Sequence, residues 1–410
     1  MDCKKKKPTL DPSIKKGYER FCKENADWLD DYTLFMAVKA TQGGISFMEW
    51  DDELRRPTAA KKAELKEELA YDMGYYAFLQ YLFFRQWAAL KTYANIKGIS
   101  IVGDIPIFVS MDSADVWANP EMFLLDEDGY PTVVAGVPPD YFSETGQLWG
   151  NPLYDWDYQK KTNYEWWMKR IKNQLSLFDY IRIDHFRGFE SYWAVPYGED
   201  TAINGKWCPG PGADFFNALQ KTFGENLPIW AEDLGIITEE VEQLRDQFSL
   251  PGMKVLQFAF ANQEDNILMP YRFASAGFIC YTGTHDNDTS QGWYKELDEK
   301  AQDRIRVYMN TSGETIHWDM IRTALSSTAK YAIYPMQDLL GYGSEARMNT
   351  PSVAGGNWQF RVRPENFNDG LAEYLKKLTG IFGRLPRERK PLVRESVAAE
   401  STKQTLEKDI

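Results

Sequence analysis

The sequence is poor in the residues that metal centres and disulfide frameworks require. Its 410 residues include only four cysteines and three histidines, and no two cysteines form a CxxC pair. This spacing fits neither a zinc site nor a disulfide framework. We therefore expect free thiols, no metal, and a reducing compartment.

Long apolar runs and phosphate-binding glycine motifs are also lacking. No stretch of about 18 apolar residues is present that could span a membrane, and no apolar signal segment follows Met1. Neither GxGxxG nor GxxxxGK[ST] occurs, which argues against a nucleotide-binding sheet. We expect a cytoplasmic protein, although a plastid protein without its transit peptide would give the same pattern.

Positive charge is scarce, whereas aromatic residues are plentiful. The formal net charge is −13, and the only basic run is Lys4–Lys7. An acidic surface repels phosphate backbones, so we expect no nucleic-acid partner, and we interpret the lysines as a solvated tail. The 14 Trp, 23 Tyr and 23 Phe indicate either a large aromatic core or rings that line a sugar groove, and composition does not decide between them.

The hydrophobic pattern predicts helices first and a parallel sheet afterwards. Residues 14–40 and 61–96 carry apolar residues at helical spacing. Short apolar runs then alternate with helical stretches, which predicts a parallel sheet covered by helices. Because the runs lack period-2 alternation, we expect strands buried on both faces. The expected strands are Ile99–Pro106, Tyr180–His185, Ile229–Asp233, Met253–Phe258, Phe278–Gly283 and Ala332–Met336, and the expected helices between them are Tyr164–Phe178, Phe215–Phe223, Thr238–Phe248 and Asp303–Met309.

Acidic residues stand at the ends of four of these runs, namely Asp104, Asp184, Glu232 and Asp286. Site residues drawn from several strand ends favour a (β/α)₈ TIM barrel over an open doubly wound sheet. Only six of the eight strands are found. We expect a helical subdomain at 1–98, a barrel domain at 99–384 with a long loop subdomain at about 110–158, and a charged tail at 385–410.

The motif Arg182-Ile183-Asp184 predicts an ionised carboxylate at a strand end. Side chains at i and i+2 share one face of a strand, so Arg182 should lie beside Asp184. A neighbouring guanidinium keeps a carboxylate charged, as a glycosidic nucleophile must be. A buried ion pair that only shapes the core would give the same motif.

Two further acidic motifs have equally ordinary alternatives. Glu232 follows three apolar residues, a setting that can raise a carboxyl pKa toward that of a general acid, but Glu232 or Asp233 could instead charge the start of a helix. His285 and Asp286 could contact sugar hydroxyls, or they could belong to a polar turn. One histidine among scattered carboxylates is weak evidence for a metal site.

Two Pro- and Gly-rich segments, 136–142 and 146–152, carry aromatic residues. Such segments suit a loop that closes over a ligand. An ordinary packed Ω-loop is the alternative.

Taken together, the motifs resemble the amylomaltase family of 4-α-glucanotransferases, over roughly residues 15–380 and in the same order. The matching segments are Gly103–Ile107, Ser113–Trp117, Pro138–Trp149, Arg182–Gly188, Ala231–Gly235, Gly283–Thr289, Gln337–Gly341, Arg347–Pro351 and Gly356–Gln359. The resemblance implies a barrel of the α-amylase type with helical insertions. It also implies transfer of α-1,4-glucan segments between maltooligosaccharides, starch or glycogen, by a retaining mechanism without metal or organic cofactor.

The resemblance also implies a role for each matched residue. Asp184 would be the nucleophile, Glu232 the general acid/base, and Asp286 the carboxylate that binds and distorts the sugar. Arg182 and His285 would support them. Asp104 would lie near the same mouth, Gln147 and Trp149 in the loop on the acceptor side, and Asn357 and Trp358 at the edge of the site.

The family normally begins with two further barrel strands, for which this sequence shows no counterpart. We therefore expect a truncated member in which 12–98 corresponds to the insertion after the second strand. A separate chain that supplies the missing strands is one partner to test for. A catalytically weak or inactive glucan-binding fragment is the alternative function, and simple hydrolysis of α-glucans is a third.

Overall fold

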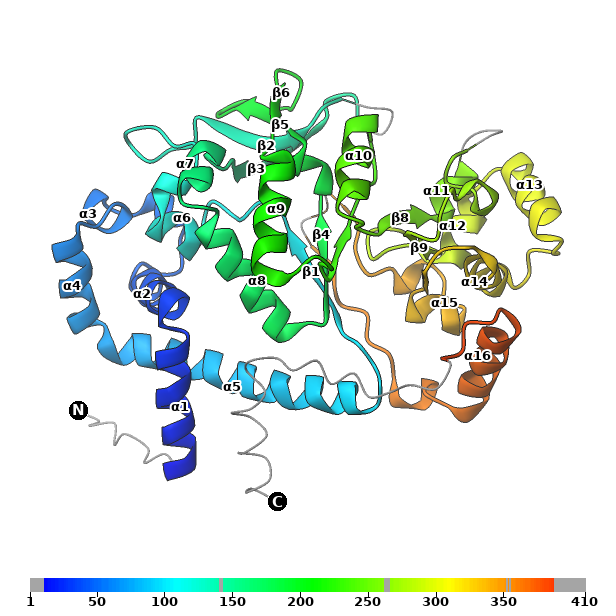
Figure 1. Cartoon of the computed structure of the whole chain (residues 1–410), viewed down its shortest axis with the longest axis horizontal. Coiled ribbons are helices and arrows are strands. Elements are labelled where there is room, and N and C mark those ends of the chain that lie inside the picture. The colour runs from blue at the N-terminus through cyan, green and yellow to red at the C-terminus, as the bar shows by residue number, and fades with distance from the viewer. Residues whose placement is uncertain (1–10, 140–142, 262–265, 352, 354, 387–410) are drawn as a thin grey trace. The chain divides into compact units, whose positions relative to one another are not determined.

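A computed structural model describes residues 11–139, 143–261, 266–351, 353 and 355–386. The chain divides into two compact units, whose described parts are residues 11–228 (unit 1) and 229–386 (unit 2). Strands alternate with helices in both units, as the sequence predicts for an α/β protein (Figure 1). No helix in these ranges is long and apolar enough to cross a membrane.

Unit 1 begins with helices that pack around one long helix, α5. Asp11 caps α1 by accepting a hydrogen bond from the backbone N of Ser13, and Pro12 occupies the first turn, where its missing N–H costs nothing. Thr58 caps α4 in the same way through Lys61 N. The helices are α1 (Pro12–Glu24), α2 (Ala26–Thr41), α3 (Asp52–Arg55), α4 (Ala59–Glu68) and α5 (Ala70–Ile96).

Helix α5 carries apolar residues on every side, yet only Ala77 and Tyr81 are buried along its 27 residues. A helix that is apolar all round is normally enclosed by protein. One face, lined by Tyr71, Tyr75, Leu79 and Phe83 at intervals of four residues, is instead exposed. We call this the α5 stripe.

The first two parallel strands of unit 1 are β1 (Val102–Pro106) and β4 (Tyr180–Asp184). Ile105, Ile181 and Ile183 are buried, and the residues between them face the other way. The expectation of burial on both faces is therefore wrong for these two strands. Their second face carries the polar side chains Asp104, Arg182 and Asp184, because a strand alternates its side chains.

An antiparallel sheet of order β3-β2-β5-β6 completes unit 1. Its strands are β2 (Val133–Val137), β3 (Gln147–Pro152), β5 (Ser191–Pro196) and β6 (Lys206–Pro209). The sequence pattern did not predict these strands, and two of them lie within the segment 110–158 that was expected to form loops. The remaining helices are α6 (Ala114–Ala118), α7 (Trp156–Lys161), α8 (Glu165–Leu177) and α9 (Gly212–Phe223).

Unit 2 contains four strands, β7 (Ile229–Ala231), β8 (Gly252–Val255), β9 (Phe278–Tyr281) and β10 (Tyr331–Ile333). Strand β9 lies between β8 and β10 and is parallel to both. Every residue of β7, β8 and β9 is buried, which confirms burial on both faces here. The helices are α10 (Glu239–Gln247), α11 (Leu256–Ala261), α12 (Ser290–Glu296), α13 (Glu299–Met309), α14 (Ile316–Ser326), α15 (Met336–Leu340) and α16 (Asp369–Ile381).

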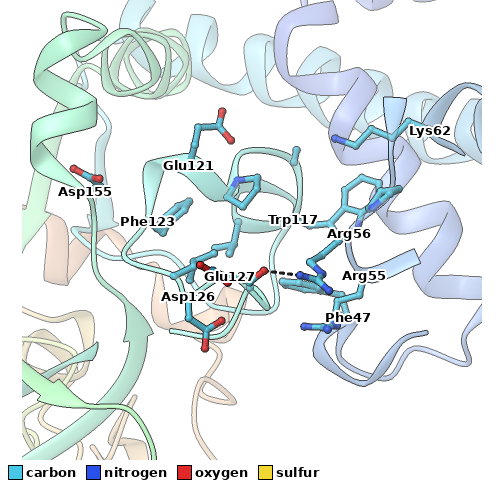
Figure 2. A pocket seen from close by; sticks show the side chains of 16 residues that line it. Phe47, Arg55, Arg56, Lys62, Trp117, Glu121, Phe123, Asp126, Glu127 and Asp155 are labelled. Atoms are coloured by element: carbon cyan, nitrogen blue, oxygen red, sulfur yellow. Dashed lines mark hydrogen bonds between the residues drawn. The ribbon is translucent and has the colours of Figure 1, made fainter. Parts of the chain in front are cut away.

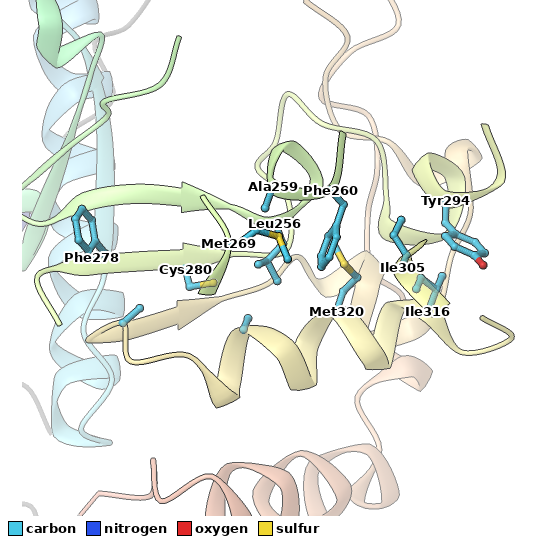
Figure 3. Close-up of a cluster of buried hydrophobic side chains, with 12 residues drawn as sticks. Leu256, Ala259, Phe260, Met269, Phe278, Cys280, Tyr294, Ile305, Ile316 and Met320 are labelled. Carbon is cyan, nitrogen blue, oxygen red and sulfur yellow. The ribbon is translucent and has the colours of Figure 1, made fainter. Parts of the chain in front are cut away.

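The core of unit 2 packs the strands against their covering helices. Cys280 from β9 and Leu256 from α11 meet Met320 from α14 in one buried cluster (Figure 3). The thiol of Cys280 is free, and burial raises its pKa to about 12, so it stays protonated. This cluster holds β9, after which His285 and Asp286 follow.

Candidate functional site

In unit 1 a single arginine holds two acidic side chains, Asp104 in the middle of β1 and Asp184 at the end of β4. The register places Asp104 opposite Arg182. One guanidinium nitrogen, Nη1, donates to both oxygens of Asp104, at 2.6 and 2.7 Å. The other, Nη2, lies 2.9 Å from Asp184 Oδ1. This is the geometry that the i, i+2 spacing of Arg182 and Asp184 predicts.

The exposed fractions of the Arg182 and Asp184 side chains suit a reactive carboxylate at Asp184. Arg182 is 11% exposed, whereas the Asp184 side chain is 49% exposed. The guanidinium is therefore fixed by packing, whereas about half of the Asp184 side chain is exposed. A positive charge at 2.9 Å favours the ionised form of Asp184.

His185, which follows Asp184, forms an aromatic contact that the sequence analysis did not assign. Its backbone is left-handed, with φ 55°. The ring meets Trp149 edge to face, with centroids 4.8 Å apart. Burial lowers the pKa of His185 to about 4, so the imidazole is neutral at pH 7. The one available signal was its position directly after a strand-end aspartate.

Gln147 and Trp149 belong to strand β3, so the expectation that 147–152 form a loop is wrong. Gln147 Oε1 accepts a hydrogen bond from Trp149 Nε1 at 3.1 Å, which fixes the indole plane. Trp149 is 39% exposed, so part of a flat ring faces solvent. Residues 140–142 of the neighbouring Pro-rich segment lie outside the described residues.

In unit 2, Glu232 directly follows β7 and is 9% exposed. Its Oε1 accepts a hydrogen bond from the backbone N of Leu234 at 2.9 Å. Helix α10 starts at Glu239 with Thr238 as its N-cap. The alternative in which Glu232 or Asp233 charges the start of that helix is therefore wrong.

The neighbouring Asp233 has a different task. Its carboxylate pairs with Arg245 of α10 at 2.5 Å and accepts from Met253 N of β8 at 2.6 Å. Asp233 and Arg245 are each 3% exposed as side chains. This buried pair joins the end of β7 to the next helix and strand, so the task of Asp233 is structural.

Asp286 lies between β9 and α12 and is held by a segment from far along the chain. Asn349 Nδ2 donates to Asp286 Oδ1 at 2.6 Å, and Arg347 Nη2 donates to the backbone O of Asp286 at 2.7 Å. On the other side, His285 Nε2 lies 3.3 Å from Asp286 Oδ2. A polar turn is present, but it is closed by Asn287 Oδ1, which accepts from Thr284 N, and not by the Asp286 carboxylate.

Asn349 and Arg347 belong to one of the segments that resemble the family, and the sequence alone does not predict them as site residues. They are separated from Asp286 by 63 and 61 positions. No local pattern links residues so far apart, so only the fold reveals the contact.

Trp358 and Asn357 lie in the same segment. The Trp358 ring is 5.2 Å from the ring of His285 and is 54% exposed. The Asn357 side chain accepts from Thr350 N at 3.0 Å and donates to Val353 O at 2.8 Å. Asn357 therefore shapes the turn that presents Trp358.

Comparison with known proteins identifies the kind of enzyme that carries these motifs. A sequence profile of the family described as 4-alpha-glucanotransferase matches residues 2–366. The chain belongs to the 4-alpha-glucanotransferase family.

Curated members of this family are similar along most of the chain. The 4-alpha-glucanotransferase of Synechocystis sp. is 52% identical over 379 residues, which are 92% of this chain and 75% of that protein. The enzyme of Thermus thermophilus is 48% identical over 386 residues, 92% of this chain and 77% of that protein. About a quarter of each relative therefore has no matched counterpart here.

Solved structures agree with the family assignment. The amylomaltase of Streptococcus agalactiae, solved in complex with acarbose, superposes with a TM-score of 0.88 and 39% identity over 92% of this chain and 76% of that one. The amylomaltase of Corynebacterium glutamicum, at 17% identity, covers 90% of this chain and 55% of that one with a TM-score of 0.68, and supports the fold alone.

A separate cavity of about 630 Å³ occurs in unit 1 of this family member, and none of the residues predicted for the site line it (Figure 2). Two of its cationic side chains are engaged with the turn at 126–129, because Arg55 donates to Asp128 O at 2.5 Å and Arg56 to Glu127 O at 2.6 Å. Asp126 closes that turn by accepting from Asp128 N and Tyr130 N. In the described ranges, no group of three or more His, Cys, Asp or Glu could hold a metal ion.

Proposed function

We propose that this enzyme transfers α-1,4-glucan segments through a retaining double displacement. In the first step the Asp184 carboxylate attacks the anomeric carbon, and Glu232 protonates the departing glucan oxygen. In the second step Glu232 takes the proton from the 4-hydroxyl of an acceptor glucan, which displaces Asp184 and regenerates the enzyme. Retention follows because two inversions occur at one carbon.

The observation that carries this assignment is the Arg182 ion pair. A nucleophile must be ionised, fixed and accessible, and Asp184 combines a guanidinium at 2.9 Å with a half-exposed side chain. Glu232 suits the acid because it is nearly buried and one oxygen is fixed by Leu234 N. Burial favours the protonated form that a general acid needs.

Asp286 suits the third role, that of the carboxylate that binds the distorted sugar. Asn349 and His285 orient its two oxygens, so the carboxylate is set before substrate arrives. Preorganised groups stabilise developing charge without reorganisation, and the transition state resembles an oxocarbenium ion. We assign His285 and Trp358 to the same substrate surface, because the indole lies 5.2 Å from the imidazole.

Transfer in preference to hydrolysis requires that a sugar occupies the acceptor side and excludes water. Trp149, with its plane fixed by Gln147, offers a flat apolar surface on which a glucose ring can stack. We assign these two residues to acceptor binding, and Asp104 to the support of Arg182. The six parallel strands would belong to a (β/α)₈ barrel of the α-amylase type, in which the residues after strand ends face one mouth.

Incubation with maltotriose tests this function. We expect glucose and a ladder of oligomers longer than the donor, and products no longer than the donor would indicate hydrolysis. Asp184→Ala should abolish both product classes, whereas Asp214→Ala, which removes an exposed carboxylate paired with Lys160, should not. Calorimetry with acarbose distinguishes a folded, binding-competent but inactive chain from one that fails to bind glucans.

A second experiment separates the two carboxylates. α-Maltosyl fluoride carries a leaving group that needs no protonation, so Glu232→Gln should still form a covalent maltosyl-enzyme with it, detectable by mass spectrometry. The variant should lose most of its turnover of maltotriose, and the residual rate should lack the alkaline limb of the pH–rate profile. An unchanged limb in Glu232→Gln would assign the proton to another group.

We further infer that a second polypeptide covers the α5 stripe and supplies barrel strands. Exposure of four large apolar side chains to water on one helix face is unfavourable, and a bound partner would bury them. The test is co-expression with the part of the Synechocystis relative that this chain does not match. A complex with at least about tenfold higher transferase activity than the chain alone is expected, since ordering a site commonly changes rates by that much. Full activity of the chain alone would refute the partner without affecting the reaction.

A further inference from the structure

One buried carboxylate, that of Asp338 in α15, binds both ends of the segment that carries His285 and Asp286. At the end of β9, Thr282 Oγ1 donates to Asp338 Oδ2 at 2.6 Å. At the start of α12, Ser290 Oγ donates to the same oxygen at 2.7 Å, and Ser290 N donates to Oδ1 at 2.8 Å. The two ends of residues 282–290 are thus joined through a single side chain.

The three residues that form this contact are buried away from solvent. Thr282 and Ser290 are fully buried, and Asp338 is 1% exposed. If the carboxylate is lost, two hydroxyls and one backbone N–H remain buried without this acceptor, which is unfavourable for each group. Burial raises the pKa of Asp338, and the hydrogen bonds from Thr282 and Ser290 together with the charge of His317 act against that rise.

The contact also ties the segment to the neighbouring strand. Asp338 follows β10, and Thr282 N donates to Ile333 O at the end of β10 at 3.2 Å. The tip of the segment is held separately by Asn349. The base of the segment, which sets the direction in which Asp286 leaves the sheet, therefore depends on Asp338.

We propose that Asp338 is a positioning residue for the transfer reaction, acting through the 282–290 segment on Asp286. This proposal rests on the role assigned to Asp286 above. The Asp286 carboxylate binds the distorted sugar of the transition state more strongly than the undistorted substrate. Displacement of this carboxylate should therefore reduce kcat more than it changes KM. An effect confined to folding would lower the yield of active enzyme without that split.

The test compares variants that remove or retain single hydrogen bonds. Asp338→Asn keeps the shape but offers an amide N–H₂ where one oxygen had accepted. Thr282→Val removes one donor, and Thr282→Ser restores it. The matched control is Thr311→Val, which removes a similar hydroxyl–carboxylate bond, 2.7 Å to Asp319, elsewhere in unit 2.

For Asp338→Asn we expect kcat on maltotriose, per active site, to fall about 10- to 100-fold while KM changes by less than about threefold, since small misplacements in an active site cost rates of this order. Thr282→Val should show the same split more weakly, and Thr282→Ser should recover. Unchanged kcat in Asp338→Asn, or an equal loss in Thr311→Val, would overturn the proposal.

A readout that needs no turnover distinguishes failure of this proposal from failure of the proposed function. Hydrogen exchange in peptides covering 283–289 should accelerate in Asp338→Asn and not in Thr311→Val. The affinity for acarbose should likewise fall in Asp338→Asn and not in Thr311→Val. If the unaltered chain binds acarbose but transfers nothing, the function is wrong while the positioning role is still decided by exchange. Unaltered exchange refutes that role.

Discussion

Asn349 supplies the shortest contact to the Asp286 carboxylate, with Nδ2 2.6 Å from Oδ1. Asn349→Asp would keep the side-chain shape and replace this donor by a like charge. We expect transferase activity to fall about 100-fold or more, because repulsion at this distance displaces or protonates a group that must hold the sugar. Steady-state kinetics on maltotriose measure the effect.

The control for this variant is Asn310→Asp, which adds the same charge at the exposed, left-handed C-cap of α13 in the same unit. It should retain activity within about twofold, as surface substitutions usually do. A similar loss in both variants would show that net charge, and not the contact with Asp286, is responsible.

His185 gives the enzyme a defined dependence of stability on pH. Its pKa is lowered by burial to about 4 in the folded chain, against 6.5 in the unfolded chain. Between these values the unfolded state binds a proton that the folded state does not, so stability rises with pH from about 4 to 6.5 and is then constant with respect to this group. Denaturant unfolding at several pH values should show this slope.

His185→Asn removes the titrating ring and keeps a residue that tolerates the left-handed backbone at this position. The difference in unfolding free energy between the original chain and this variant should itself vary between pH 4 and 6.5. A difference that is constant over this range would mean that the imidazole titrates alike in both states.

At the scale of single residues, the sequence predicts only contacts between residues that lie close together along the chain. Arg182 and Asp184 lie two positions apart on one strand, so their contact follows from the alternation of side chains. The contacts of Asp286 with Asn349 and of Thr282 with Asp338 join residues 63 and 56 positions apart. No periodicity encodes them, because they form only when two strand ends are brought together.

At the scale of elements, β1 depends on a glycine for its packing. A Cβ on Gly103 would lie 2.1–2.4 Å from ring atoms of Phe178, which follows α8. Gly103→Ala should therefore destabilise the chain by about 1–3 kcal/mol, as overpacked cores do, and should shift β1, which carries Asp104, relative to β4. Urea unfolding and maltotriose kinetics check the two effects.

Gly74 in α5 is the matched control, because nothing lies within 4 Å of a Cβ added there. Gly74→Ala should stabilise the chain by about 0.5–1 kcal/mol through the helix propensity of alanine. If both alanines destabilise equally, the contact with Phe178 is not the cause.

All six expected strands are present. The apolar runs of β7, β8 and β9 reflect complete burial, whereas β1 and β4 alternate buried residues with more exposed ones. The sequence pattern does not predict the strands β2, β3, β5 and β6, for a physical reason. Strand β2 pairs with β5, which lies far along the chain, and burial patterns such as intermediate–buried–buried–buried–intermediate in β2 follow no simple alternation. Antiparallel pairing of this kind is decided by neighbours and not by the strand's own residues.

At the scale of the whole molecule, the net charge of −13 and the α5 stripe act in opposite directions. Excess negative charge keeps copies of the chain apart, whereas an exposed row of large apolar side chains favours association. Neutral glucans are not repelled by the charge, so it does not oppose substrate binding. We therefore expect association with other proteins to occur through the α5 stripe.

The double variant Leu79→Glu with Phe83→Glu tests this reasoning. Both side chains are exposed, so the fold should persist, whereas burial of two carboxylates beneath a partner would be strongly unfavourable. We expect the variant to lose the complex with the co-expressed fragment and the accompanying gain in activity, measured by light scattering and maltotriose turnover. Thr92→Glu, which is exposed on the opposite side of α5 from Phe83, should keep both. If the double variant still forms the active complex, the partner binds a surface other than the α5 stripe, and the apolar face of this helix requires a different explanation.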